Sequence, residues 1–279
     1  MNILVTLNAN YVPALRVMLK SLFVNNPDEQ LTIYLMHSAI PPAEVARLAR
    51  FVDAEGHRLA PVKVEAGLFA EDAVVFRRYS KEMYYRLAAH RYLPDSVDRV
   101  LYLDPDIVAI NPVGEFYQTD LEPYYFCAAE NITPFARFTV KFNQIRLGTP
   151  RAKSYFNSGV LLMNLERMRK ELDLSDIFHF LKENRYKLIL PDQDVLNGLF
   201  WDKIKRVDEL RYNFDARYYE LIKYFPNHPV TLKWIEENTV FIHYCGKRKP
   251  WHKTYRDELG RYYRHYERML HQQLEEVTV

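Results

Sequence analysis

The chain has 279 residues, of which 48% are hydrophobic, enough to form a large buried core. Thirty-eight basic and 36 acidic residues leave a formal net charge of +2, so no global field indicates nucleic acid as a partner. Two cysteines, Cys127 and Cys245, are too few for a disulfide framework and fit a reducing compartment. No apolar stretch reaches the length of a membrane span. We therefore expect a cytoplasmic protein, or one that is peripheral at the inner face of the cell membrane.

The first 110 residues alternate strand and helix patterns. Apolar runs of strand length cover residues 2–7 and 31–36, and a shorter run covers 62–64. Helical spacing of apolar residues follows the first two runs, beginning at Pro13 and at Pro41. This alternation predicts an α/β fold, in which a mostly parallel sheet carries helices on both faces.

The rest of the chain has a mixed pattern. We expect Ser80 to cap a helix over 81–92 that Pro94 ends. Residues 131–154 are basic and aromatic without periodicity, which predicts a mobile loop over a cleft. Further strands are expected over 99–103, 124–129, 156–164 and 239–243, and further helices over 174–185, 193–200 and 256–274.

Two carboxylates follow the expected strand over 99–103, in the run Leu101-Tyr102-Leu103-Asp104-Pro105-Asp106. Residues two apart at a strand end can direct their side chains to one point. Two oxygen donors there suit Mg2+ or Mn2+, and ligands of open α/β sheets lie beyond the carboxyl ends of the strands. An Asp-x-Asp pair arises easily by chance, so this interpretation needs partners elsewhere in the chain.

A second cluster follows the last expected strand, in the run His243-Tyr244-Cys245-Gly246-Lys247-Arg248-Lys249-Pro250-Trp251. A lone histidine at a strand end is more often a core or surface residue than a metal ligand. Here, however, Gly246 allows the backbone to approach a ligand, and the three consecutive cations suit phosphate. His243 could complete a metal site with Asp104 and Asp106, and such a donor set favours Mn2+ over Mg2+.

Polar residues at two further places allow two interpretations each. Asp192 is either a helix N-cap, with Asp194 favoured by the helix dipole, or part of a helix start that faces sugar hydroxyls. Asn157 and Ser158 interrupt an apolar strand, either as ligand contacts or as buried groups that bond to backbone.

The first strand runs into Asn8, Asn10 and Tyr11. The two amides could bond a nucleobase edge on which Tyr11 stacks, although turn chemistry would equally explain the asparagines. Neither a Gly-x-Gly-x-x-Gly motif after this strand nor a P-loop occurs, which disfavours binding of dinucleotides and P-loop chemistry. The sequence remains compatible with a nucleoside diphosphate ligand that is held by a metal ion.

Taken together and in this order, the motifs resemble those of glycosyltransferase family 8. The resemblance covers about residues 1–255 and depends on Leu-Tyr-Leu-Asp-x-Asp, Phe-Asn-Ser-Gly-Val-Leu-Leu-Met-Asn, Asp-Gln-Asp-x-Leu-Asn and His-Tyr-Cys-Gly-x-x-Lys-Pro-Trp. It implies a GT-A type, Rossmann-like fold over 1–253, with a small C-terminal helical elaboration over 254–279. It also implies a retaining, metal-dependent enzyme, like bacterial lipopolysaccharide galactosyl- and glucosyltransferases and glycogenin.

The resemblance implies the following roles for individual residues. The metal ligands would be Asp104, Asp106 and His243, and the catalytic residues Arg86, Asp192 and Gln193. The donor nucleotide sugar would contact Thr6, Asn8, Asn10, Tyr11, Arg86, Asp104, Asn157, Gly246 and Lys249. Asn8 stands where many members have aspartate, and Glu130 stands where a bacterial galactosyltransferase has a shorter acid.

The implied function is transfer of galactose or glucose from UDP-galactose or UDP-glucose, with Mn2+ or Mg2+. The acceptor would be a hydroxyl of a glycan or a lipid-linked saccharide, as in bacterial cell-surface glycan biosynthesis. Retention could arise by attack from the face of the leaving group, or through contact with Gln193 or Asp192. One alternative is a non-catalytic UDP-sugar-binding protein of the same fold. The other, a phosphatase of the haloacid dehalogenase type, is disfavoured because residues 107–109 supply no hydroxyl side chain.

The expected C-terminal helix also allows two interpretations. Arg256, Arg261, Arg264 and Arg268 alternate with tyrosines and could face anionic lipid in a peripheral membrane contact. Alternatively, the helix packs on the domain and its arginines are solvated. Glutamates in the same segment dilute the positive charge and favour the second interpretation. The sequence does not predict an oligomeric state.

Overall fold

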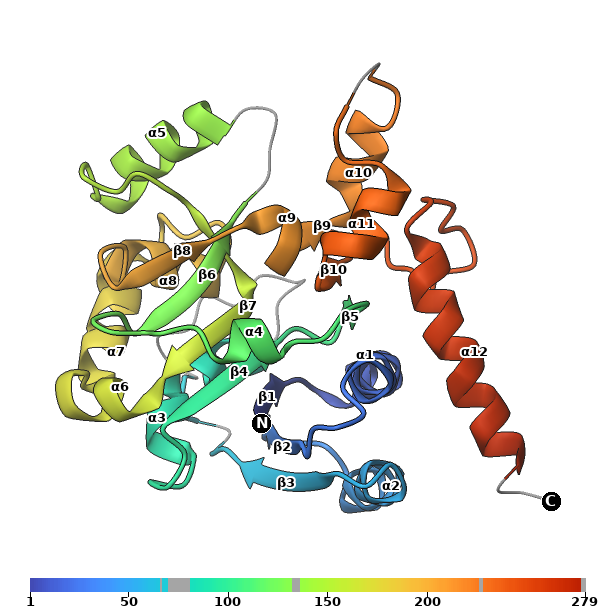
Figure 1. The fold of residues 1–279 in the computed structure, drawn as a ribbon. Helices are drawn as coiled ribbons and strands as arrows, with labels where there is room; N and C mark the ends of the chain where they lie inside the picture. The colour runs from blue at the N-terminus through green and yellow to red at the C-terminus, as the bar shows by residue number, and fades with distance from the viewer. Residues whose placement is uncertain (66, 70–80, 132–135, 226–227, 277–279) are drawn as a thin grey trace.

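The alternating apolar runs form a seven-stranded sheet in the computed structural model, which describes residues 1–65, 67–69, 81–131, 136–225 and 228–276 (Figure 1). In spatial order the strands are β3 (Arg58–Lys63), β2 (Thr32–His37), β1 (Asn2–Thr6), β4 (Arg99–Leu103), β7 (Phe156–Asn164), β6 (Phe126–Glu130) and β8 (Ile204–Val207). Only β7 runs antiparallel to its neighbours β4 and β6, so the prediction of a mostly parallel α/β sheet is confirmed.

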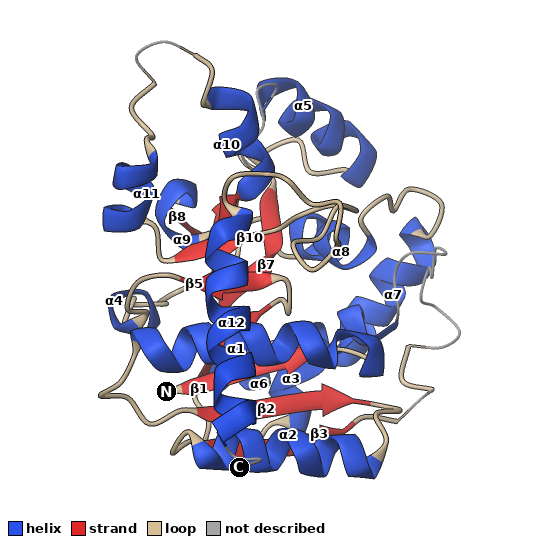
Figure 2. Ribbon diagram, turned by 90° about the vertical axis from the view of Figure 1, so that its right-hand side faces the viewer, coloured by secondary structure: helices blue, strands red, loops and turns tan. Residues whose placement is uncertain are grey.

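Helices cover both faces of this sheet. Because strand side chains alternate, Ile3 and Val5 of β1 point into one hydrophobic core while Leu4 points into the other. The helices of the first core include α1 (Val12–Asn25), α2 (Pro42–Ala54) and α12 (Gly260–Glu276), and Figure 2 shows α1 and α12 in front of the strands. The second core is covered by η2 (Lys81–Ala88), α3 (Ala89–Tyr92), α6 (Leu165–Glu171), α7 (Leu174–Asn184) and α8 (Pro191–Leu199).

A second, three-stranded sheet joins distant parts of the chain. It consists of β5 (Ile107–Ala109), β10 (Phe241–His243) and β9 (Phe214–Asp215), with β10 in the centre. β10 runs antiparallel to β5, which pairs His243 with Ile107. The short strand β5 directly follows Asp106, so this pairing brings His243 beside the aspartates of the β4–β5 turn.

The prediction of a loop over 131–154 was wrong, because α5 (Ala136–Leu147) occupies half of this segment. The large apolar residues Phe138, Phe142 and Ile145 of α5 are exposed, so the helix lacks the buried apolar stripe that reveals an amphipathic helix in a sequence. Arg146 holds the helix in place, since its Nη1 and Nη2 atoms each donate to Asp194 over 2.6 Å.

Other boundaries also differ from the expectations. The segment before Pro94 forms the 3-10 helix η2 followed by one turn of α3, and the expected cap Ser80 lies outside the described residues. Edge strand β3 is longer than expected because its half-exposed residues hide its pattern. The sequence did not predict η1 (Ala9–Tyr11), β5, α4 (Gly114–Tyr117), α6, β8, α9 (Glu209–Tyr212), β9, α10 (Ala216–Ile222) and α11 (Leu232–Asn238).

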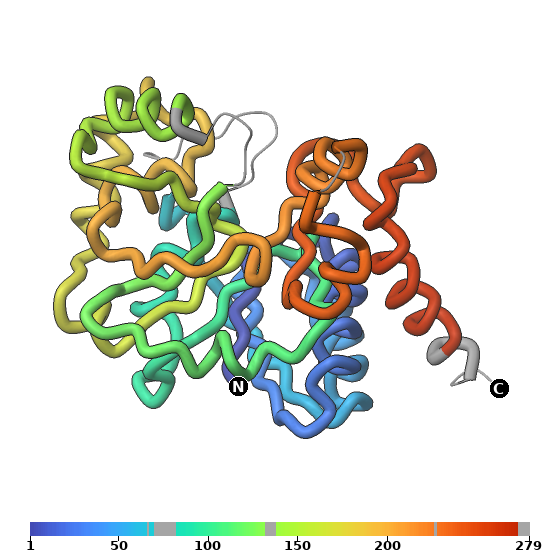
Figure 3. The backbone as a smooth tube through the Cα atoms, turned by 45° about the horizontal axis from the view of Figure 1, so that its top comes forward, coloured from blue at the N-terminus to red at the C-terminus, as the bar shows by residue number. Residues whose placement is uncertain are grey.

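The helix α12 lies against α1, as Figures 1 and 3 both show. The Tyr266 hydroxyl accepts a hydrogen bond from Asn25 Nδ2 at 2.7 Å, and the Tyr244 hydroxyl donates to the Leu259 carbonyl at 2.9 Å. Tyr263 and Leu270 of the same helix are buried in the first core. The apolar side of α12 is therefore in contact with the protein. No helix among the described residues is both long and apolar enough to span a bilayer.

We expect stability to depend on pH through His90 in α3, which is 1% exposed. Burial and the cations Arg91 and Arg169 lower the pKa of His90 to about 4. The unfolded chain, with a histidine pKa of about 6.5, therefore takes up its proton first. The contribution of His90 to the free energy of unfolding therefore keeps its full value above about pH 6.5. It declines as pH falls towards 4, by up to about 3 kcal/mol.

Urea unfolding of the wild type and of His90→Gln at pH 7 and pH 4.5 tests this expectation. The variant should show a smaller loss of unfolding free energy between the two pH values. His179→Gln, which replaces an exposed histidine, should behave like the wild type. An equal loss in the wild type and in His90→Gln would contradict the assignment.

Candidate active site

The two aspartates are fixed where the large sheet passes into the small one. The Asp104 backbone N–H donates to the Gly159 carbonyl of β7 at 2.8 Å. The Asp106 carbonyl accepts from the N–H of Tyr244, the residue after His243, at 3.0 Å. The turn is therefore held by β7 on one side and by the end of β10 on the other.

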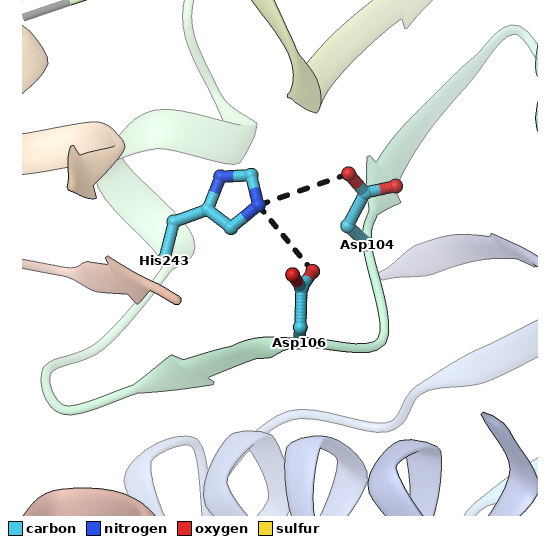
Figure 4. A group of neighbouring side chains, drawn as sticks. All are labelled: Asp104, Asp106 and His243. Atoms are coloured by element: carbon cyan, nitrogen blue, oxygen red, sulfur yellow. Dashed lines mark ion pairs between the residues drawn. The ribbon is translucent and has the colours of Figure 1, made fainter. Parts of the chain in front are cut away.

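The side chains of Asp104, Asp106 and His243 converge, as Figure 4 shows. His243 Nε2 lies 3.3 Å from Asp106 Oδ1 and 3.8 Å from Asp104 Oδ2. One ligand atom from each residue lies within 4.8 Å of the others. Asp106 is 7% and His243 4% exposed, so the cluster lies largely out of bulk water.

A cation holds the second oxygen of each carboxylate. Arg86 Nη2 lies 3.0 Å from Asp104 Oδ1, and Lys249 Nζ donates to Asp106 Oδ2. Each carboxylate therefore directs one oxygen towards a cation and the other towards His243 Nε2. Two oxygen atoms and one imidazole nitrogen that converge in this way fit a divalent cation such as Mn2+.

Burial and neighbouring charges act in opposite directions on two groups of this cluster. Burial alone would raise the pKa of Asp106, but Lys249 and His243 lower it well below its usual range. Burial alone would lower the pKa of His243, but the Cys245 thiol and the Asp106 carboxylate raise it well above its usual value. Asp106 is therefore ionised, and a metal ion would compete with a proton at His243.

Arg86 is the buried centre of the site. Its Nη1 donates to the Ser158 carbonyl at 2.6 Å and lies 3.5 Å from Asp192 Oδ2. Its guanidinium also lies over the Tyr102 ring, 4.0 Å from the ring centroid. Burial would lower the pKa of Arg86, but Asp104, Tyr102 and Asp192 raise it, so the guanidinium stays charged. Arg86 thus connects the cluster of Asp104, Asp106 and His243 with the start of α8.

The start of α8 separates the roles of neighbouring residues. The helix begins at Pro191 with Leu190 as its N-cap, so the interpretation of Asp192 as the N-cap was wrong. Asp192 Oδ2 instead accepts from the Ser158 hydroxyl at 2.9 Å, and burial raises the pKa of this carboxyl. Gln193 Oε1 accepts from the Ser158 N–H at 3.3 Å, whereas Gln193 Nε2 is buried without a hydrogen-bond partner among the described residues.

The N-terminal residues lie beside the loop after β10. Asn8 Oδ1 accepts from the Asn10 N–H at 3.0 Å, so local turn chemistry accounts for Asn8. Tyr11 is partly exposed, and its ring meets Trp251 edge to face at a centroid distance of 6.1 Å. In the same loop Gly246 has a φ of +87°, which favours glycine.

The expected donor contact Thr6 and the departure at Glu130 lie elsewhere in this region. Thr6 is buried, with its hydroxyl 3.4 Å from the Tyr102 hydroxyl. Glu130 Oε1 accepts from Ser154 and lies 3.1 Å from Arg206 Nε. The structure therefore brings together the three possible metal ligands, Lys249, Arg86 and the start of α8, but leaves Glu130 bound to its own neighbours.

Two residues of the site were not predicted. Gly159 lies against the possible metal ligands, since a Cβ atom there would lie 2.3 Å from His243 Cε1. Asn213, just before β9, places its Oδ1 2.9 Å from His243 Nδ1. The glycine in the Asn157-Ser158-Gly159 run was a usable signal, because glycine within a strand often marks close approach of another group. No spacing in the sequence indicates Asn213.

The fold and this site together define a glycosyltransferase of the GT-A type. The sequence profile of glycosyl transferase family 8 matches residues 2–255, and the chain belongs to this family. The match makes it a glycosyltransferase and removes the phosphatase alternative.

Individual relatives agree with the family. A crystal structure of the galactosyltransferase LgtC, in complex with donor and acceptor sugar analogs, matches with a TM-score of 0.81 and 26% identity over 96% of this chain and 95% of that chain. General stress protein A of Bacillus subtilis (strain 168) is 28% identical, over 94% of this chain and 92% of that protein. Lipopolysaccharide 1,2-glucosyltransferase of Escherichia coli (strain K12) is 27% identical, over 91% of this chain and 73% of its own length.

We expect Gly159→Ala to destabilise the protein by about 1–3 kcal/mol, because the added methyl group must displace the His243 ring or the carboxylate of Asp104, whose Oδ2 would lie 2.9 Å from it. Urea unfolding at pH 7 measures the change. Gly114→Ala is the matched control, because nothing lies within 4 Å of a Cβ atom at Gly114. Its unfolding free energy should stay within about 0.5 kcal/mol of the wild type. Equal stabilities of the two variants would show that His243 does not pack against β7.

Proposed function

We propose that this glycosyltransferase moves galactose or glucose from UDP-galactose or UDP-glucose to a hydroxyl of a glycan or lipid-linked acceptor, with retention at the anomeric carbon. The convergence of Asp104, Asp106 and His243 on one point carries the proposal. In this proposal the three residues hold Mn2+, or Mg2+ as the second choice, which binds the donor diphosphate.

The balance of charge supports a diphosphate as the ligand. The carboxylates Asp104 and Asp106 are each paired with one cation, Arg86 and Lys249 respectively. These four charges cancel, so a bound divalent cation leaves the cluster with an excess of positive charge. The diphosphate of a nucleotide sugar carries one negative charge on each phosphate, which can offset that excess.

The same cations would assist departure of UDP. A bound divalent cation supplies Lewis-acid stabilisation of the charge that grows on the leaving diphosphate. Lys249 and Arg86 are held by hydrogen bonds before any ligand enters, so they would act as preorganised positive groups. Lys249 also contacts the Tyr244 carbonyl at 3.0 Å, which keeps its ammonium group near the Asp106 side of the cluster.

We assign the sugar end of the donor to the start of α8 and to Asn157. Gln193 has a buried amide N–H without a partner among the described residues, and such a donor is costly unless a ligand accepts from it. A sugar hydroxyl supplies that acceptor. Asp192 is bonded to Ser158 and lies near Arg86, which holds its carboxylate towards the same region.

We assign the uridine end to the surface formed by Asn10, Tyr11 and the loop of Gly246. The exposed part of the Tyr11 ring beside Trp251 is suited to stacking on a base. Asn10 keeps its side-chain amide for the base, since within the described part of the chain its hydrogen bond to the Asn8 side chain uses the backbone N–H.

The donor is testable by UDP release from a panel of nucleotide sugars in the presence of Mn2+. We expect release from UDP-galactose or UDP-glucose, with water as acceptor, and none from GDP-mannose. His243→Ala should lower Mn2+-dependent release by about 100-fold, because it removes a ligand of the ion that stabilises departing UDP. His179→Ala replaces an exposed histidine and should match the wild type. Unchanged Mn2+-dependent release by His243→Ala would refute the metal assignment.

We further propose that residues 254–279 serve as a packed extension of a transferase domain over 1–253 and not as a membrane anchor. The buried tyrosines of α12 support this, because a helix that inserts into lipid must expose its apolar side.

Co-sedimentation with vesicles that contain anionic phosphatidylglycerol tests this assignment. We expect the same bound fraction for the wild type and for a variant with Arg261→Gln, Arg264→Gln and Arg268→Gln, because the apolar side of the helix stays in the protein core. A marked loss of binding in the triple variant would instead assign α12 to the membrane surface. Unfolding by urea serves as the control that the variant is folded.

A further inference from the structure

We propose that Asn213, oriented by Asn157, is a positioning residue that fixes the His243 ring with a proton on Nδ1 and leaves Nε2 as the atom for a metal ion. The inference rests on the proposed metal site and deepens it. It concerns a chain of side-chain amides behind the cluster, which runs from β7 to the residue before β9 and on to β10.

The chain of hydrogen bonds begins at a group whose direction is unambiguous. A peptide N–H can only donate, and the N–H of Gly159 lies 2.8 Å from Asn157 Oδ1. The atom of Asn157 at that position must therefore be the amide oxygen. Its Nδ2 consequently faces the other way, where it donates to Asn131 Oδ1 at 3.0 Å.

The direction is then passed to Asn213. An amide oxygen can only accept, so the atom of Asn213 that lies 2.9 Å from Asn157 Oδ1 must be Nδ2. The remaining atom of the Asn213 amide is its oxygen, which lies 2.9 Å from His243 Nδ1. Because this oxygen also can only accept, His243 Nδ1 must carry a hydrogen.

The consequence concerns the opposite edge of the ring. His243 Nε2 is the atom directed at Asp106 and Asp104. With Nδ1 held as a donor, the proton that the ring loses on binding a metal ion is the one on Nε2, and the lone pair appears at the cluster. If Asn213 were turned over, its Nδ2 would face Nδ1, and the ring would keep its hydrogen on Nε2.

Burial makes this control effective. Asn213 and His243 are each 4% exposed, so water cannot readily replace a lost amide partner. The register of β9 with β10, which pairs Phe214 with Ile242, holds Asn213 beside the histidine. Partners that bond the outer nitrogen of a metal-binding histidine typically change metal affinity by about 10- to 100-fold.

Asn157 acquires a second task in this arrangement. Its oxygen already accepts from Gly159 and from Asn213, so that oxygen is committed to orienting the chain of amides. A contact of Asn157 with the donor sugar would therefore use its Nδ2 group.

Binding of Mn2+ alone, followed by electron paramagnetic resonance at pH 7.5, tests the proposal without catalysis. We expect Asn213→Ala to raise the dissociation constant by about 10- to 100-fold. Asn213→Asp keeps an oxygen towards Nδ1 but turns its second oxygen towards the acceptor Asn157 Oδ1, so it should recover only part of the affinity that Asn213→Ala loses. Asn157→Ala leaves the Asn213 amide in place but free to rotate, so it should weaken Mn2+ binding less than Asn213→Ala does.

Asn111→Ala is the matched control. Asn111 donates to the carbonyls of Glu236 and Thr239, next to β10, and makes no bond to His243. Its variant loses a comparable pair of amide hydrogen bonds and should bind Mn2+ like the wild type. His243→Ala defines the affinity without the imidazole ligand.

Nitrogen-15 chemical shifts of the His243 ring in the Mg2+-loaded protein are a second measurement. A loss of protein stability alone would not change them. The wild type should show a protonated Nδ1 and an unprotonated Nε2, and Asn213→Ala should show a mixture. Wild-type Mn2+ affinity and an unchanged tautomer in Asn213→Ala, with affinity lost in His243→Ala, would overturn the proposal for Asn213. Wild-type affinity in His243→Ala would instead overturn the metal site itself, so the two failures are distinguishable.

Discussion

The convergence of two carboxylates, one buried and one partly buried, is the constraint on which the rest of the site depends. Asp104 and Asp106 stand in one turn, and like charges removed from water repel unless positive groups compensate them. Arg86 and Lys249 supply that compensation from η2 and from the loop after β10. These two segments must therefore place their cations beside the turn. Loss of Lys249 would leave the buried carboxylate of Asp106 without its cation, and an uncompensated buried charge destabilises the folded state.

The three-stranded sheet brings Lys249 to Asp106 although the two residues are far apart in the sequence. Lys249 and Asp106 are 143 residues apart in sequence. The antiparallel pairing of β5 with β10 closes that distance with backbone hydrogen bonds, independently of the charges. The charged groups thus meet because the backbone register places them together, and the ion pairs add directionality to a framework that hydrogen bonds and apolar packing already hold.

The sequence predicted the parts of this arrangement that follow from local pattern. Continuous apolar runs predicted the central strands, because a strand buried on both faces needs little else. It did not predict α5, whose large apolar residues are exposed, or β9, which has two residues and no periodicity. Asn213 was missed for the same reason, since its position beside His243 is set by the register of that short strand. When strand register in the folded protein brings two residues together, their spacing in the sequence does not indicate the hydrogen bond between them.

The Asp192-Gln193-Asp194 run shows how a family motif can combine chemistry with scaffold. Asp192 and Gln193 point to Ser158 and to the site, whereas Asp194 is fully buried on the other side. Asp194 accepts from Arg146, from the Tyr155 hydroxyl and from two backbone N–H groups at the start of α8. It fixes the first turn of the helix, and that turn determines where its two neighbours point. The two aspartates stand together because one positions the other, although only the first has a side chain that faces Ser158 and Arg86.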